Sequence, residues 1–348
     1  MSLVTSLQRI KDAKADIKAA IESKGVSVGS GLIDTYADKI REIKGEETVV
    51  DDFSFISQNG TRAAGLFHNM TALTKVPANC TFKQPTSFEN MFYNCYALTE
   101  APQLDTSRAT SVRCMFRETH SLRAVPDYET AAVKDFARMF NVSAVVYAPD
   151  LDTSSGTNFY GMFASDPALQ KLPAYDLQSG RDFSYMFNYC QNVQNTEELV
   201  YHVWAGQMFQ YMFNYCRTMQ VAPSLYSWNG KAFHYMFADC YQLHTIPYIA
   251  LGSAVERCYD YNNLTVYPCF EGMFLNCYNL QNITISGGIK YDISFSSCSK
   301  LTRASLLNII EQLVQTTTPR YLGLSKASQN LLSDSEKAVI IAKGWKIH

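Results

Sequence analysis

Apolar and polar residues recur along this chain with a period of about 24 residues. The dipeptide Met-Phe marks the period, and its in-register copies begin at Met91, Met115, Met139, Met162, Met186, Met212, Met236 and Met273, with degenerate copies at Leu66 and Ser294. Consecutive copies lie 23 to 26 residues apart, except for a step of 37 before Met273 and a step of 21 after it. One further Met-Phe, at Met208, is out of register. A period of roughly 20 to 29 residues is typical of leucine-rich-type solenoids, so the pattern predicts about ten stacked rungs.

Two further positions keep step with Met-Phe and predict the buried side of each rung. Three residues before the methionine stands an apolar side chain, at Phe88, Val112, Phe136, Phe159, Phe183, Phe209, Phe233 and Phe270. Offsets of −3, 0 and +1 share one face of a short helical turn, which we expect to pack inward. Four residues after the methionine comes a cysteine, at Cys95, Cys190, Cys216, Cys240, Cys277 and Cys298, replaced in three copies by Thr119, Ser143 and Asp166. We expect reduced, buried thiols, because one fixed place in a stacked repeat makes each cysteine a small core residue.

The other half of each rung is predicted to be a short strand. A leucine-like residue follows the methionine by seven positions and a proline by eleven, as in Leu73/Pro77, Leu98/Pro102, Leu122/Pro126, Leu169/Pro173, Met219/Pro223 and Leu243/Pro247. Proline cannot donate a hydrogen bond into a ladder and restricts the backbone at the following bend. Together with the inward-packing turn, these strands predict an α+β repeat fold, a leucine-rich-repeat-type solenoid over residues 53–301.

The step of 37 contains surplus residues that leave the solenoid as an insertion near residues 251–268. Tyr259, Tyr261 and Tyr267 lie in it, and they form a candidate adhesion loop because insertions in solenoids often map to the binding face. The alternative is a surface loop with no role of its own.

Residues 1–44 differ from the repeats and predict a helical hairpin. Apolar residues at helical spacing form a stripe on each helix, and the candidate partner-binding residues are Leu7, Ile10, Ile17, Ile21, Leu32, Tyr36 and Ile40. A unit this small buries little surface alone, so we expect it to pack against another copy or another protein. The alternative is a simple cap on the solenoid. The charged residues 45–52 are predicted to be a linker.

Residues 302–348 end the repeat and predict a C-terminal helical cap. A helix is expected to begin at Ser305, followed by a short strand over 321–324 and a helix that runs from a capping box at Ser333 and Glu336 to Lys343. An atypical terminal segment of this kind supplies the polar outer side that a stacked repeat needs.

Composition and charge narrow the function classes. The chain is 47% hydrophobic and 18% charged, which indicates a folded protein with a large core. Thirty Lys and Arg balance 32 Asp and Glu, so we expect neither nucleic acid nor a membrane surface as a partner. No apolar run has the length of a membrane span, and the N-terminal residues do not resemble a secretion signal.

No catalytic constellation stands out in the sequence. The six histidines are scattered without a ligand-spaced partner, and neither a nucleophile elbow nor a phosphate-binding glycine loop is present. We therefore expect no enzyme activity, no cofactor and no metal site.

Tyrosines form three further periodic sets, which comprise Tyr93, Tyr189 and Tyr215; Tyr185, Tyr211 and Tyr235; and Tyr96, Tyr241 and Tyr278. Either they stack on one another and seal the solenoid, or some are exposed and suit adhesion to a glycan or a protein.

Three segments resemble known families. The residues MFYNCYALTEAPQLDTS and the repeated MFNYC, with Met-Phe, Cys and Pro at fixed offsets over roughly 53–301, resemble BspA-type leucine-rich repeats of bacterial surface proteins and phage fibres. The segment LQRIKDAKADIKAAIESKGVSVGSGLIDTYADKI resembles a helical module at the start of phage structural proteins, and SLLNIIEQL with SDSEKAVIIAKGW resembles the cap of phage tail and fibre proteins. The substitutions in the cysteine column and the long insertion depart from the regular repeat.

The resemblance implies a virion-attached fibre or head or tail appendage of a bacteriophage. Residues 1–44 would dock on other virion proteins and form a homodimer or homotrimer, and the repeats would contact a glycan or protein on the host surface. The alternative is a bacterial cell-surface adhesin, which requires a secretion signal, or a protein-binding module. An enzyme that carries the repeats as a binding module is a third, weaker alternative, because the segments outside the repeats are too short for a catalytic domain.

Overall fold

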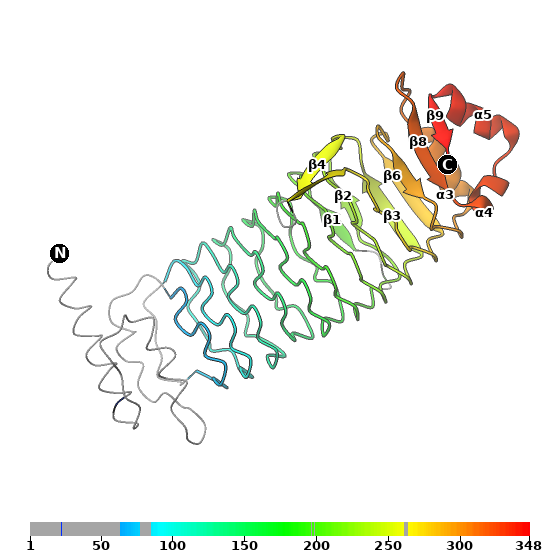
Figure 1. The fold of residues 1–348 in the computed structure, drawn as a ribbon. Helices are drawn as coiled ribbons and strands as arrows, with labels where there is room; N and C mark the ends of the chain where they lie inside the picture. Colours follow the sequence, from blue (N-terminus) through cyan, green and yellow to red (C-terminus); the bar gives the residue numbers. More distant parts are fainter. Residues whose placement is uncertain (1–21, 23–62, 77–84, 196, 198, 261–263) are drawn as a thin grey trace, which may run out of the picture.

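The computed structural model describes residues 22, 63–76, 85–195, 197, 199–260 and 264–348. From residue 63 onward they form an elongated solenoid of stacked rungs that ends in a small helical cap (Figure 1). Apart from Glu22, the predicted helical hairpin and the linker over 45–52 lie outside the described residues. None of the described helices is both long and apolar enough to cross a membrane.

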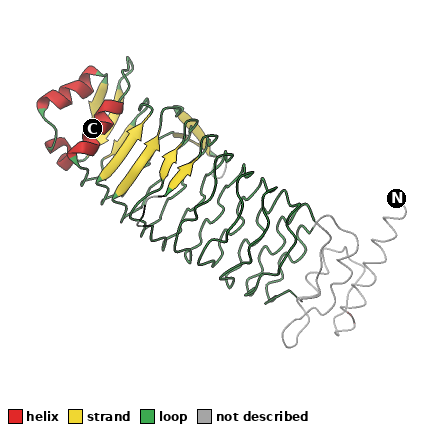
Figure 2. Ribbon diagram, turned by 180° about the vertical axis from the view of Figure 1, so that it is seen from behind, coloured by secondary structure: helices red, strands yellow, loops and turns green. Residues whose placement is uncertain are grey.

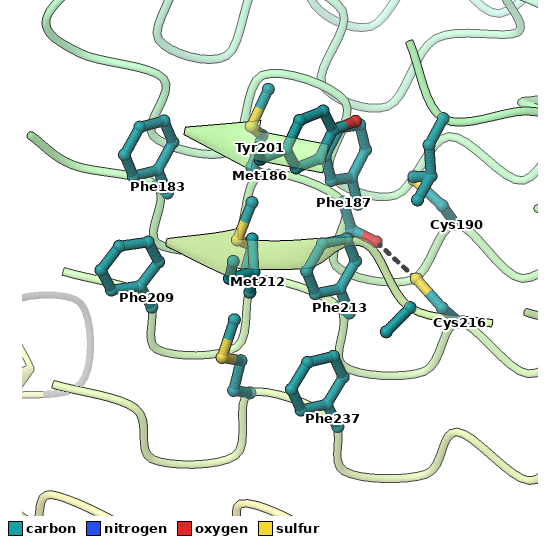
Figure 3. Close-up of a cluster of buried hydrophobic side chains, with 14 of the residues drawn as sticks. Phe183, Met186, Phe187, Cys190, Tyr201, Phe209, Met212, Phe213, Cys216 and Phe237 are labelled. Carbon is teal, nitrogen blue, oxygen red and sulfur yellow. Dashed lines mark hydrogen bonds between the residues drawn. The ribbon is translucent and has the colours of Figure 1, made fainter. Parts of the chain in front are cut away.

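Stacked columns of identical side chains form the core, as the repeat predicts. The phenylalanines of Met-Phe make one unbroken column, in which neighbouring ring centroids are 4.7 to 6.1 Å apart, through Phe67, Phe92, Phe116, Phe140, Phe163, Phe187, Phe213, Phe237, Phe274 and Phe295. The methionines and the phenylalanines at −3 run beside it (Figure 3). The out-of-register Met208 only precedes Phe209, which belongs to the −3 column. Each rung therefore buries the same apolar set against both neighbours.

The backbone of the Met-Phe segment is a chain of tight turns, so the expected helical turn is wrong. Alternate N–H groups donate to the next rung, for example Asn90 to Arg113, Phe92 to Met115 and Asn94 to Arg117, each at 2.9 Å. The intervening N–H groups close turns within the rung, as in Met91 to Phe88 at 3.1 Å. This pattern needs a positive φ just before the methionine and three residues after it. Tyr211, at φ 57°, is one of several non-glycine residues with a positive φ at these positions. The hydrogen bonds between rungs offset the conformational cost of this backbone geometry.

Extended strands are confined to the C-terminal rungs of the described chain (Figure 2). A parallel sheet has the order β1-β2-β3-β6 and consists of β1 (Val200–His202), β2 (Ser224–Tyr226), β3 (Thr245–Ala250) and β6 (Asn282–Ser286). The expected strand is present there as β3, but Pro247 is the third of its six residues and the strand continues to Ala250, so the prediction that proline ends the strand is wrong. Earlier rungs make only isolated bridges, such as Lys75 with Glu100, so the strand prediction is wrong for them. Their equivalent segments combine proline with Asp, Glu and Gln, whereas β3 and β6 carry β-branched residues.

The C-terminal cap largely matches its prediction. It contains α3 (Arg303–Gln312), α4 (Lys326–Asn330) and α5 (Asp334–Ala342), with β7 (Ile293–Phe295), β8 (Arg320–Leu324) and β9 (Trp345–Ile347) in a parallel sheet. The capping box at Ser333 and Glu336 is confirmed. The Ser305 hydroxyl accepts a hydrogen bond from the backbone N–H of Ile283 at 3.0 Å, so it does not cap the helix. Helix α3 therefore begins earlier than expected, with Thr302 as its N-cap.

The cysteine column is buried and reduced within the described residues, as predicted. Its thiols donate across the stack to the phenylalanine carbonyl of the preceding rung, for example Cys95 Sγ to Phe67 O at 3.0 Å and Cys216 Sγ to Phe187 O at 3.2 Å (Figure 3). Where cysteine is replaced, Thr119 bonds to the Phe116 carbonyl of its own rung at 2.7 Å, and Ser143 donates to Asp166 Oδ2 of the next rung at 2.7 Å. A thiol, a hydroxyl or a carboxyl group thus occupies this place in each described rung from Met91 onward.

We expect these thiols to be unreactive in the folded protein. Burial raises the pKa of Cys95 and of Cys298 to about 12 and that of Cys258 to about 11, so little thiolate forms at neutral pH. Labelling with iodoacetamide at pH 8, followed by peptide mass spectrometry, should leave the nine described cysteines unmodified until urea unfolds the chain. Rapid labelling of Cys216 without denaturant would contradict a sealed column.

Candidate functional site

The insertion before Met273 is a two-stranded hairpin that packs back onto the solenoid. Strands β4 (Arg257–Asp260) and β5 (Thr265–Pro268) pair antiparallel, with Cys258 opposite Tyr267 and Tyr259 opposite Val266. Figure 1 shows the hairpin beside the sheet that contains β1, β2 and β3. Alternation along the strands points Cys258 and Asp260 inward and leaves Tyr259 and Val266 exposed.

Beneath the hairpin runs a ladder of tyrosines from successive rungs. Tyr185 and Tyr211 stack at 4.7 Å, and Tyr211 and Tyr235 stack at 5.1 Å. Gly272 follows in the next rung, where a Cβ would lie 2.3 Å from the Tyr235 ring, so glycine leaves room for the last tyrosine. The ladder therefore forms an aromatic floor for the inner side of the hairpin.

A buried histidine and a buried aspartate meet between the hairpin and this floor. Asp260 accepts a hydrogen bond from the Tyr185 hydroxyl at 2.8 Å, and its Oδ2 lies 3.8 Å from His234 Nε2. The His234 ring stacks on Tyr267 at 4.8 Å and meets Tyr211 edge-on at 5.5 Å. Neither ring nitrogen of His234 has a hydrogen-bond partner among the described residues. Burial lowers the pKa of His234 to about 4, against the opposing charge of Asp260, so the ring is neutral at pH 7.

This arrangement fixes the hairpin and is sealed from solvent. The side chains of His234 and Asp260 are 0% and 1% exposed, which leaves no access for a substrate. Cys258 donates to the Lys231 carbonyl at 3.5 Å and is held as a thiol by burial. Outside the solenoid core, Glu256 pairs with Arg320 of the cap at 2.8 Å. Within the described residues no group of three or more His, Cys, Asp or Glu side chains is placed to hold a metal ion.

The structure separates the residues of the predicted adhesion loop. Tyr259 is on the outer side of the hairpin and is 38% exposed, whereas Tyr267 is half-buried against His234. Tyr261 lies outside the described residues, as do the predicted partner-binding residues Leu7, Ile10, Ile17, Ile21, Leu32, Tyr36 and Ile40. Leu264 and Val266 extend the exposed apolar surface near Tyr259. An adhesive role for the hairpin stays a prediction.

Within the three predicted tyrosine sets, some rings stack on one another and some remain partly exposed. Tyr189 and Tyr215 stack at 4.3 Å, and Tyr241 and Tyr278 face each other at 6.2 Å. Tyr96 packs instead against a histidine of the next rung, His120, at 4.8 Å. The outermost rings remain partly in solvent, since Tyr96, Tyr189 and Tyr278 are each about 40 to 50% exposed.

A second aromatic surface lies on the outward face of β1, β2 and β3, and the sequence analysis missed it. We call it the aromatic face, and it consists of His202, Trp204, Tyr226, Trp228 and Tyr248. Four of its rings are in contact, His202 with Tyr226 at 5.3 Å, Tyr226 with Tyr248 at 4.4 Å and Trp204 with His202 at 5.2 Å. The sequence signal was the tryptophan eight residues before both Met212 and Met236.

The buried His234 is expected to make the stability of the chain sensitive to acid. Because the pKa of His234 is lower in the folded chain than its ordinary 6.5, the unfolded chain binds the extra proton, and stability is lost as pH falls from 6.5 towards 4. His234→Phe keeps an aromatic ring and removes the titration. We expect the variant to lose less stability than the parent between pH 7 and pH 5, by on the order of 1 kcal/mol, measured by urea unfolding.

The matched control for this measurement is His120→Phe, which changes a histidine that lies in the exposed layer. Its pH dependence should follow that of the parent chain. Identical acid sensitivity in the parent and in His234→Phe would show that the buried ring does not govern the response.

Comparisons with known proteins identify the family of the chain and a likeness to solved structures. A family described as "Mycoplasma protein of unknown function, DUF285" matches at residues 61–172, 86–199 and 148–247, which together span 61–247, more than half of the 348 residues. No curated protein matches the chain. Among solved structures, a leucine-rich repeat protein from Bacteroides ovatus ATCC 8483 is 14% identical, with a TM-score of 0.32, over 75% of this chain and 69% of that chain.

Proposed function

The chain belongs to the family described as "Mycoplasma protein of unknown function, DUF285", and from that premise we propose that it is a non-enzymatic surface-recognition protein. Its solenoid acts as a stiff rod that presents exposed aromatic side chains to another surface. The observation that carries this proposal is the division of the aromatic residues. Phenylalanine columns close the core along the described rod, while several tyrosines, such as Tyr189 and Tyr278, and two of the three tryptophans, Trp204 and Trp228, are exposed on its outside.

The buried titratable groups support recognition over catalysis. Catalytic acids, bases and nucleophiles must reach a substrate, and such groups usually line an open cleft. Here the strongly shifted groups, such as Asp166, Cys216 and His234, are buried in the stack or under the hairpin. Burial stabilises their neutral forms, which suits a structural role.

More specifically, we propose that the chain is a fibre or appendage subunit of a bacteriophage particle. Residues 1–44 would attach it to other virion proteins and assemble two or three copies, and the rod would contact the surface of the host. The support is the resemblance of both terminal segments to phage structural proteins, together with the elongated form of the described rod (Figure 1).

Assembly through residues 1–44 can be tested by native mass spectrometry and negative-stain microscopy of the full chain and of a chain that lacks those residues. We expect a dimer or trimer of rods for the full chain and folded monomeric rods after truncation. Monomers in both cases would reject the assembly role. Mass spectrometry of purified phage particles that encode the protein tests the virion assignment, and its absence from them would reject that assignment.

A bacterial cell-surface protein is the second candidate, because the description of the family names Mycoplasma, a bacterium. The two candidates make different predictions for fractionated cultures. A virion subunit should co-sediment with particles, whereas a cell-surface protein should remain with washed cells in cultures that release no phage. In both cases we expect the purified, fluorescently labelled full chain to bind intact bacterial cells.

A further inference from the structure

The aromatic face is built from three adjacent strands and the turns that follow two of them. His202 on β1 pairs directly with Tyr226 on β2, so their rings project from the same side of the sheet. Trp204 and Trp228 each lie two residues further along, in the turns that leave β1 and β2. The five side chains therefore form two short parallel rows that run along the rod from rung to rung, with a spacing of about 4.8 Å between strands.

A bulge in β3 directs the last ring of the row. Ile246 pairs with Ile283 and Ile249 pairs with Ile285, so two residues of β3 stand opposite the single Thr284 of β6. Both isoleucines remain buried, and the extra residue turns Tyr248 outward onto Tyr226. The Tyr248 hydroxyl then accepts a hydrogen bond from Ser286 Oγ at 2.6 Å, which fixes its orientation.

The two tryptophans are exposed, and the turns that carry them are held in place. Trp204 and Trp228 are 45% and 57% exposed. Their backbone carbonyls accept hydrogen bonds from the next rung, from Asn229 Nδ2 at 2.7 Å and from Ser253 Oγ at 2.6 Å. Four earlier rungs carry Ser107, Ala131, Ser154 and Gln178 at the place of these tryptophans, eight residues before the methionine of Met-Phe. A pair of exposed tryptophans on fixed turns, confined to two rungs, favours contact with a partner, because solvent-exposed indole surface is unfavourable without one.

The size and charge of the aromatic face narrow the kind of partner. None of the outward positions of β1, β2 and β3 carries Asp, Glu, Lys or Arg, so no ion pair is available for an anionic or cationic ligand. Five partly exposed rings offer on the order of 400 Å². A stable interface between two copies of a protein needs about 800 Å² from each.

A neutral sugar chain fits these features. Pyranose rings have flat apolar faces of C–H groups that stack on indole and phenol rings, and their hydroxyls bond to groups at the rim such as the His202 ring and the Tyr226 and Tyr248 hydroxyls. The ladder spacing along the rod is close to the length of one sugar residue. We propose that the aromatic face is a binding site for a neutral polysaccharide, with Trp204 and Trp228 as its stacking residues. This inference rests on the proposed surface-recognition function and names its ligand class.

The test is affinity electrophoresis of the full chain in native gels that contain dextran, yeast mannan or soluble starch, with polygalacturonate as the acidic comparison. We expect at least one neutral polysaccharide to retard the chain and polygalacturonate not to. The Trp204→Ala/Trp228→Ala double variant should lose at least tenfold in affinity for that polysaccharide. Tyr147→Ala is the matched control, since Tyr147 is 61% exposed and lies away from the aromatic face, and it should bind as the parent does.

Retardation by none of the neutral polysaccharides, retardation by polygalacturonate alone, or full binding by the double variant would overturn the inference. Both tryptophans are exposed, so the double variant should fold, and circular dichroism checks that it does. Binding of labelled chain to intact cells separates this inference from the proposed function. Cell binding by a chain that binds none of the neutral polysaccharides rejects the sugar site alone, whereas polysaccharide binding without any cell binding rejects surface recognition alone.

Discussion

Phe213→Ala is expected to lower the free energy of unfolding by about 3 to 5 kcal/mol, more than any exposed substitution in the chain. The ring of Phe213 is completely buried and stacks between Phe187 at 5.6 Å and Phe237 at 5.4 Å (Figure 3). Truncation removes apolar area and leaves a cavity that the rungs on either side cannot fill, because their backbones are tied by hydrogen bonds across the stack.

The position of this ring within the solenoid increases the effect. Each rung of a solenoid contacts only its neighbours, so a defect in a central rung weakens two interfaces at once. Urea unfolding monitored by circular dichroism measures the loss, with Tyr147→Ala as the control because it removes an exposed aromatic ring of similar size. The control should change stability by less than about 0.5 kcal/mol. Similar small losses in the two variants would mean that the phenylalanine column does not hold the rungs together.

Asp166→Cys is expected to stabilise the chain at neutral pH, the reverse of the usual effect of a core substitution. Asp166 occupies the cysteine column and is completely buried. Burial raises the pKa of its carboxyl from 3.8 to about 6, even though Ser143 donates to it at 2.7 Å and the backbone N–H of Ala168 at 3.0 Å. At pH 7 the folded chain therefore holds a buried charge, whereas the other described rungs carry an uncharged side chain at this place, in most of them a thiol.

The pH dependence distinguishes this explanation from simple repacking. Because the pKa of Asp166 is higher in the folded chain, the folded state binds the proton more tightly, and the penalty of the charge is absent below pH 3.8 and complete above pH 6. The advantage of Asp166→Cys should thus shrink by about 2 kcal/mol between pH 7 and pH 4.

Asp127→Asn provides the control for this titration, since it alters an exposed aspartate outside the cysteine column. We expect it to change the free energy of unfolding little at either pH. An advantage of Asp166→Cys that is the same at pH 4 and pH 7 would show that packing, not the buried charge, is responsible. Thermal unfolding by calorimetry at the two pH values is sufficient to decide.

Much of the core could be predicted from the spacing of residues alone. Phe183, Phe187 and Cys190 recur with the period of the rung, and a side chain that recurs at every turn of a stacked repeat meets its own copies in the neighbouring rungs. The cap was predictable for a local reason, because the capping box of Ser333 and Glu336 is formed within one helical turn.

The candidate surfaces could be predicted much less well. Tyr259 and Tyr267 belong to the same insertion, yet one faces solvent and the other stacks on His234, and the side of each depends on how the hairpin pairs and folds back. The aromatic face joins residues from three rungs, and Tyr248 belongs to it only because of a bulge whose partner, Thr284, is more than thirty positions away in the sequence.

The sequence by itself determined that this protein is a repeat with about ten rungs, which side chains form its columns, and that its cysteines are core residues. Only the tertiary structure decided the backbone of each rung, the rungs in which strands form, and the surface where the insertion packs. The physical reason is that periodicity records which side chains face inward, whereas the conformation of each segment is fixed by hydrogen bonds to residues one rung away. Such bonds allow tight turns with positive φ at Tyr185 and Tyr211 where local preference alone would suggest a helix.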